Sequence, residues 1–299
     1  DALRSNTTAD NNTAVGYQSL YANTTGSALT AVGTAALDAN TTGIDNTAVG
    51  VSSLGGNTTG GANVAVGRAA LLDNTTGGNN TAVGYQSLKD NTTGGANVAV
   101  GYNALQNNTT ASNNIAIGQS AMDVCTTGNS NIAIGRDAGV ALTTSANENV
   151  MIGYQAGKSL TTISYQNTLI GTSAGNDLTN NSNYNTCVGN NSGNDLTNSA
   201  AHNIFIGHSS TTVSGNADRQ ICIGTDISSI GEDYITLGRN TSGRVYNQFS
   251  SNASWTRTSD VRLKKDIQDN TDLGLDFVND LRTVTYKWKA PSEQPTDFL

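Results

Sequence analysis

A short apolar unit that ends in glycine recurs fourteen times along residues 1–240. The glycines are 17 residues apart seven times, then 18 apart four times, and finally 17 and 14 apart. The apolar part, for example residues 97–100 before Gly101, is too short for a helix and alternates as a short strand does. We therefore expect one strand per repeat. The strands should precede Gly16, Gly33, Gly50, Gly67, Gly84, Gly101, Gly118, Gly135, Gly153, Gly171, Gly189, Gly207, Gly224 and Gly238.

A second apolar residue follows four positions after the glycine. It is Leu in the first six repeats, for example Leu88, and Met122 in the seventh. Corners such as the Asn-Thr-Thr-Gly at 57–60 suit tight turns, because Asn and Gly tolerate positive φ. A single repeat cannot bury its few apolar side chains, so the repeats must stack in register. This predicts an all-β parallel β-solenoid or β-roll of about fourteen turns. We expect its inner row to consist of the Val or Ile before each glycine, such as Val100, together with the Leu.

Asparagine stands four places before the glycine in eleven of the fourteen repeats. Stacked Asn side chains can form an amide ladder along a solenoid. The same residue is also a good corner residue without any ladder. Both interpretations fit this pattern. The residues are Asn12, Asn46, Asn63, Asn80, Asn97, Asn114, Asn131, Asn149, Asn167, Asn185 and Asn203.

The position two before the glycine changes in character along the chain. It is Ala in the first eight repeats, for example Ala99, and then becomes Met151, Leu169, Cys187, Phe205, Cys222 and Thr236. Small side chains let two surfaces approach closely, whereas larger ones fill a wider gap. Our hypothesis is that this face contacts another chain. The alternative is that the change only reshapes the interior of the coil.

The composition excludes several classes of function. Charged residues make up 13%, aromatic residues 5% and apolar residues 36%, while Asn, Thr and Gly number 39, 41 and 33. A large enzyme core is therefore not expected. A net charge of −8 argues against nucleic-acid binding. The chain contains no run of 18 apolar residues, which is the length that a membrane-spanning helix needs. The chain starts at Asp1 inside a repeat, without Met or a signal segment, which is typical of a fragment or processed product.

Cysteine and histidine give no sign of a disulfide framework, a metal site or a cofactor. Cys125, Cys187 and Cys222 are scattered and show no Cys-x-x-Cys spacing. His202 and His208 have no Cys, Asp or Glu at ligand spacing. The Asn-Thr-Thr corners would be N-glycosylation acceptors in a eukaryotic secretory route, although repeat regularity explains them without glycans. These acceptors are Asn6, Asn23, Asn40, Asn57, Asn74, Asn91 and Asn108.

A different module begins after residue 240. Both Trp, both Pro and seven of the fifteen Lys and Arg lie beyond residue 250. Residues 241–258 alternate loosely and are expected to form a β-strand transition. In 259–299, residues 272–281 have helical spacing of apolar positions and 283–288 alternate like a strand, which predicts a small α+β segment.

The repeats resemble the head repeats of trimeric autotransporter adhesins, whose units read Asn-x-Val-Ala-Ile-Gly. The matching residues are Asn-Ile-Ala-Ile-Gly at 114–118 and again at 131–135, and the resemblance covers about residues 10–240. It implies left-handed parallel β-rolls that form homotrimers. The repeat here is longer than the usual one in that family.

The six residues Ser-Asp-Val-Arg-Leu-Lys at 259–264, with a second block at 281–288, resemble the start of the intramolecular chaperone domain of endosialidases. That family stands at the C-terminus of phage tail spikes, tail fibres and related surface proteins. The resemblance implies help with trimer assembly and self-cleavage next to Ser259. Ser259 would be the nucleophile and Lys264 the base, since a partly desolvated Lys has a lowered pKa. The alternative is that Ser259 caps a helix and Lys264 is a solvated charge.

Together these observations predict an extracellular, homotrimeric structural or adhesive fibre of a virion tail or a cell surface. Its possible partner is a host glycan or receptor, with no nucleic acid and no membrane insertion. One alternative is a glycan-degrading tail spike, which would need paired carboxylates. Asp177 and Asp195 recur at equivalent places, but this is better explained as a regular turn. The other alternative is an ice-binding solenoid, because Thr pairs such as 75–76 and 92–93 form ranks.

Overall fold

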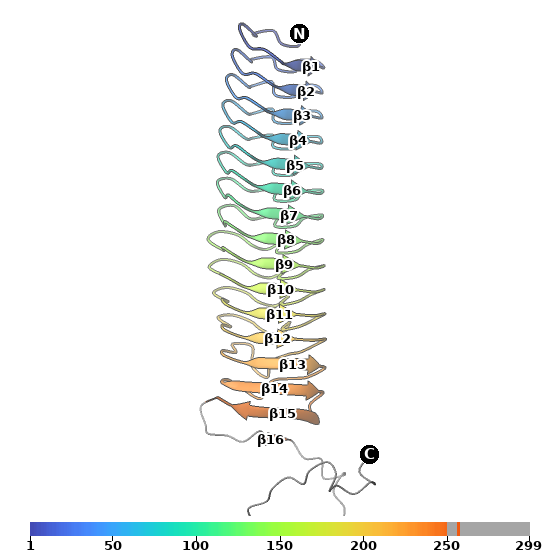
Figure 1. The fold of residues 1–299 in the computed structure, drawn as a ribbon, viewed down its shortest axis with the longest axis vertical. Coiled ribbons are helices and arrows are strands. Elements are labelled where there is room, and N and C mark those ends of the chain that lie inside the picture. The colour runs from blue at the N-terminus through green and yellow to red at the C-terminus, as the bar shows by residue number, and fades with distance from the viewer. Residues whose placement is uncertain (250–255, 258–299) are drawn as a thin grey trace, which may run out of the picture. The chain divides into compact units, whose positions relative to one another are not determined.

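The computed structural model describes residues 1–249 and 256–257, which form a parallel β-solenoid of about 13 turns (Figure 1). Each turn adds one short strand to a single 16-stranded sheet whose strand order follows the chain. The all-β solenoid is confirmed, and the described residues contain no helix. The strands are β1 (Thr13–Val15), β2 (Thr30–Val32), β3 (Thr47–Val49), β4 (Val64–Val66), β5 (Thr81–Val83), β6 (Val98–Val100), β7 (Ile115–Ile117), β8 (Ile132–Ile134), β9 (Val150–Ile152), β10 (Thr168–Ile170), β11 (Thr186–Val188), β12 (Ile204–Ile206), β13 (Ile221–Thr225), β14 (Tyr234–Arg239), β15 (Gly243–Gln248) and β16 (Thr256–Arg257).

The strands β1 to β14 are parallel and stacked without a register shift. Equivalent residues of successive repeats pair directly, as Ala82 does with Ala99. The 18-residue repeats keep this register, as Leu169 and Cys187 show, so their extra residue is absorbed outside the strands. At the C-terminal end the chain reverses, and β15 pairs antiparallel with β14 (Figure 1).

The inner and outer sides of the strands are the reverse of our expectation. The middle residue of the strand, such as Ala99, is fully buried, whereas Val98 and Val100 on either side of it are only partly buried. The Val and Ile side chains therefore do not form the inner row. The Leu four places after the glycine does, since Leu88 is completely buried. The coil is narrow, so only a small side chain fits opposite Leu.

The larger residues that replace Ala also lie inside the coil. Met151, Leu169 and Phe205 are fully buried, so the hypothesis that this position contacts another chain is wrong. The alternative of a reshaped interior is correct. A Cβ atom added at Gly157 would lie 2.8 Å from Cδ1 of Leu169.

Glycine replaces the inner Leu in four successive repeats, where it lies next to the larger side chains of Met151, Leu169 and Cys187. The Leu reappears three residues later, as Leu160 does after Gly157, and is again fully buried. Side-chain volume has thus been exchanged between two neighbouring positions, which keeps the core filled. The glycines of this exchange are Gly139, Gly157, Gly175 and Gly193.

Candidate functional site

The predicted amide ladder runs through the interior of the solenoid. Asn97 donates from Nδ2 to Oδ1 of Asn80 at 3.1 Å and to the carbonyl of Ala111 at 2.9 Å. Its backbone N–H also donates to the same Asn80 oxygen, at 3.0 Å. The pattern continues through the later coils to Asn203, where Gln220 follows and donates its backbone N–H to the Asn203 side chain. The interpretation of these Asn residues as a ladder is confirmed.

A second amide ladder lies at the corners and was not predicted. Nδ2 of Asn74 donates to Oδ1 of Asn57 at 2.8 Å and to the carbonyl of Gly77 at 3.0 Å. Asn74 in turn accepts a hydrogen bond from Asn91, at 2.7 Å. These side chains are fully buried, so a folded coil has no room for N-linked glycans at them. One feature of the sequence does indicate that this position is interior: later repeats replace the Asn by Cys125 and then by Leu142.

The corner ladder ends where Cys125 replaces Asn. Oδ1 of Asn108 is buried there and has no hydrogen-bond partner. The Cys125 thiol instead lies 3.6 Å from the carbonyl of Gly128. Burial raises the pKa of Cys125 to about 11 and that of Cys187 to about 12. These cysteines, and Cys222, are free, buried and protonated at neutral pH, which makes them poor nucleophiles.

Extending the corner ladder by one residue should stabilise the protein. Asn in place of Cys125 would donate to the unpaired Asn108 oxygen and to the Gly128 carbonyl. We expect Cys125→Asn to raise the free energy of unfolding by about 1 kcal/mol. Thermal melts followed by circular dichroism would measure this, with Cys125→Ala as the control that removes the thiol and adds no amide. A Cys125→Asn protein no more stable than Cys125→Ala would contradict the prediction.

The outward side of the sheet is apolar, and we call it the strand face. It consists of the first and third residues of β1–β12 and their register partners in β13 and β14. The first-residue rank contains Thr, Val and Ile, whereas the rank beside the glycines contains only Val, Ile and one Leu, and along these described strands neither rank holds a charged side chain. Ile117 and Ile206 are each 37% exposed. The rank beside the glycines is Val15, Val32, Val49, Val66, Val83, Val100, Ile117, Ile134, Ile152, Ile170, Val188, Ile206, Ile223 and Leu237.

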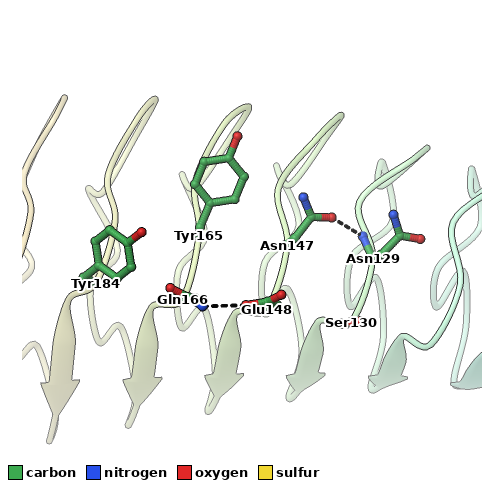
Figure 2. Close-up of a pocket in the computed structure, with 7 residues that line it drawn as sticks. All are labelled: Asn129, Ser130, Asn147, Glu148, Tyr165, Gln166 and Tyr184. Atoms are coloured by element: carbon green, nitrogen blue, oxygen red, sulfur yellow. Dashed lines mark hydrogen bonds between the residues drawn. The ribbon is translucent and has the colours of Figure 1, made fainter.

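A groove of about 470 Å³ lies along the edge of the coils where the chain approaches β8 to β11. Figure 2 shows that its lining comes from successive coils, so the groove follows the direction of stacking. Gln166 donates to the Glu148 carboxylate at 2.6 Å across one coil interval. The lining residues are Asn129, Ser130, Asn147, Glu148, Tyr165, Gln166 and Tyr184.

The remaining candidate residues of the sequence do not form an active site in the described structure. His202 and His208 pair with Asp218 and Asp226 at 3.3 and 3.1 Å. No group of three His, Cys, Asp or Glu side chains in the described residues could hold a metal ion. Ser259 and Lys264 lie outside the described residues.

Asp177 and Asp195 occupy equivalent places on neighbouring coils. Burial raises the pKa of Asp177, and the negative charge of Asp195 raises it further, while Lys158 acts in the opposite direction. Both Asp residues follow from the repeat and do not line the groove.

The two Thr residues of each corner pair differ in their exposure to solvent. The first Thr of each pair is partly buried, and Thr75 donates its hydroxyl to the carbonyl of Thr92 at 2.9 Å. The second, for example Thr76, is exposed. One exposed Thr rank therefore remains at this edge. The two-rank surface on which the ice-binding alternative was based is not present.

In the comparison with known proteins, one family matches the C-terminal segment. Residues 259–297 match the family described as chaperone of endosialidase. This match supports the resemblance found in the sequence and begins at Ser259. No curated protein and no solved structure matches the chain. Among the residues that the structure describes, none belongs to a helix with the length and apolarity needed to cross a bilayer.

Proposed function

We propose that this chain is the shaft of a homotrimeric surface fibre, of the kind found in phage tails or on cell surfaces, with a structural or adhesive role. Its three solenoids would pack side by side through their strand faces. The observation that carries this proposal is the strand face itself, which is uncharged along both ranks from β1 to β14 and wholly apolar along the rank beside the glycines.

A lone solenoid would leave this face in contact with water. Contiguous apolar patches of such extent mark interaction sites on soluble proteins. The β-branched side chains stack at intervals of about 4.8 Å and form a flat, regular surface. A second copy offers the same surface with the same spacing. Three copies around one axis bury their strand faces together and form a closed assembly that does not grow sideways.

The C-terminal segment favours a trimer of this chain over a dimer. The chaperone family that matches residues 259–297 is associated with trimer formation. In the proposed role, this segment holds three chains together while the strand faces pack. The deep burial of a long face also gives slow unfolding, which suits a fibre outside the cell.

Self-cleavage is part of the proposal. The Lys264 amine would remove the proton of the Ser259 hydroxyl, whose oxygen then attacks the carbonyl carbon of the adjacent peptide bond. The C–N bond breaks, the released amine takes the proton back from Lys264, and the carbonyl is left as an ester on Ser259. Water would then hydrolyse this ester, which frees the Ser259 hydroxyl and separates the shaft from the chaperone segment. Intact-mass measurements of the purified protein would then show two fragments, and Ser259→Ala would give one uncleaved chain. An uncleaved wild-type chain would refute self-cleavage, but it would not contradict the proposal that the protein forms a fibre.

The oligomeric state tests the role of the strand face. The uncleaved Ser259→Ala protein should have three times the mass of one chain by mass photometry, and the cleaved wild-type protein should have three times the mass of the shaft fragment. The double substitution Ile117→Lys and Ile134→Lys puts charges on the face and should yield single chains. The control pair Thr93→Lys and Thr110→Lys puts the same charges on exposed corners of coils in the same part of the rod and should remain trimeric. Wild-type protein at the mass of one chain, or Ile variants that stay trimeric, would refute the proposal.

A further inference from the structure

The groove beside β8 to β11 is built from larger side chains than the same positions hold in some earlier coils. In two earlier repeats the same two positions are Gly61 with Ala62 and Gly95 with Ala96. Those coils have the same strands and the same register, so small residues are sufficient for folding there. In the later coils these positions hold residues as large as Tyr165 and Tyr184. Stacking alone therefore does not require aromatic rings at this edge.

The lining is held in place before any ligand arrives. Oδ1 of Asn147 accepts the backbone N–H of Asn129 at 2.7 Å, a contact drawn in Figure 2. The Tyr184 ring stacks on the His202 imidazole with centroids 4.9 Å apart and an angle of 16°. Tyr184 nevertheless stays 50% exposed. A fixed aromatic side chain of this kind loses little freedom on binding, which favours recognition.

The chemistry of the lining selects the class of ligand. Its side chains are amides, hydroxyls, two aromatic rings and one carboxylate, and none is cationic. Amides and hydroxyls both donate and accept hydrogen bonds, as a polyhydroxylated ligand requires. Tyrosine adds an apolar ring face for the C–H side of a sugar. The Glu148 carboxylate, with no cation in the lining, disfavours sulfated, phosphorylated or acidic ligands.

The dimensions favour a chain of sugars over a single one. The lining comes from four successive coils, which span on the order of 14 Å at about 4.8 Å per interval. The volume of about 470 Å³ lies within the range of small-ligand sites. From these observations we propose that the groove binds an uncharged, linear oligosaccharide lying parallel to the stacking direction. This inference rests on the proposed role as a surface fibre and names the chemistry that the fibre would bind.

Isothermal titration of the full chain tests the proposal. The probes are maltohexaose, cellohexaose, laminarihexaose and N-acetylchitohexaose, with a heparin hexasaccharide as the charged comparison. At least one uncharged probe should bind and the heparin fragment should not. The double substitution Tyr165→Ala and Tyr184→Ala should weaken that binding at least about tenfold, which corresponds to about 1.4 kcal/mol.

A matched control is present in the same chain. Tyr85 and Tyr102 also lie on neighbouring coils, with ring centroids 5.3 Å apart, and neither lines the groove. Their double substitution by Ala should leave binding unchanged. The inference is overturned if none of the four uncharged probes binds, if the control pair weakens binding equally, or if the groove variant dissociates the oligomer and so proves to be a subunit contact. Mass photometry of the same samples separates the two proposals, since a trimer without binding refutes only the groove, whereas single chains refute the fibre.

Discussion

Gly84→Ala is expected to unfold several coils and to lower the melting temperature by about 6–12 °C, for a loss of about 3 kcal/mol. Gly84 follows β5 and has a φ of +136°. A Cβ atom there would lie 2.3 Å from the carbonyl oxygen of Gly101 and 2.7 Å from its carbonyl carbon. Both atoms are backbone, so no side-chain rotation relieves the clash. The two coils must separate, and the stacked strands lose their hydrogen bonds.

The matched control is Gly61→Ala in the preceding part of the rod. Gly61 lies at the coil edge, where the nearest atom to an added Cβ is the carbonyl oxygen of Ile44 at 3.2 Å. Other repeats hold Ser112 and Asn129 at the equivalent position, so side chains are tolerated there. Thermal melts by circular dichroism and limited proteolysis of the two variants provide the measurement. Equal melting temperatures for Gly84→Ala and wild type would show that the coils can spread at no cost.

The stacking of the repeats could be predicted from sequence because it follows from a simple constraint. One repeat cannot bury Leu88 alone, and a fixed 17-residue period puts every such Leu in line. Which side of the strand faces inward could not be predicted. Val98, Ala99 and Val100 are all apolar, so alternation gives no signal for the buried side. The deciding factor is the width of the coil, which depends on the Leu across from Ala.

The groove was beyond sequence reasoning for a related reason. Tyr165 lies six residues before its glycine, while Tyr184 lies five residues before the next one. An alignment of repeats puts the two rings in different columns, and only the stacking of coils brings both to the same edge. The corner ladder was hidden by its composition, because Asn74 in an Asn-Thr-Thr-Gly corner looks like an ordinary turn residue.

Asn74→Ala should destabilise the solenoid more than substitution of an exposed Asn or of the terminal Asn of the ladder. Its side chain makes three buried hydrogen bonds, to Asn57 at 2.8 Å, to Gly77 at 3.0 Å and from Asn91 at 2.7 Å. Alanine leaves the Asn57 oxygen without a donor, whereas the Gly77 carbonyl keeps its hydrogen bond from Asn63 and the Asn91 amide keeps its bond to the Gly94 carbonyl. A buried polar group without a partner costs about 1–3 kcal/mol, so we expect a loss of about 2 kcal/mol. The measurement is the melting temperature by circular dichroism.

Two further variants separate the ladder from a general effect of removing Asn. Asn79→Ala changes an exposed residue in the same repeat, at a position where Ala62 and Ala96 occur in the neighbouring repeats, and should stay within about 0.5 kcal/mol of wild type. Asn108→Ala removes the last amide of the ladder, whose Oδ1 has no partner, and should cost less than Asn74→Ala. Because hydrogen bonds in a chain strengthen one another, the interior residue must lose more than the end residue. Equal losses at Asn74 and Asn108 would mean that the corner amides act as separate turn residues and not as a ladder.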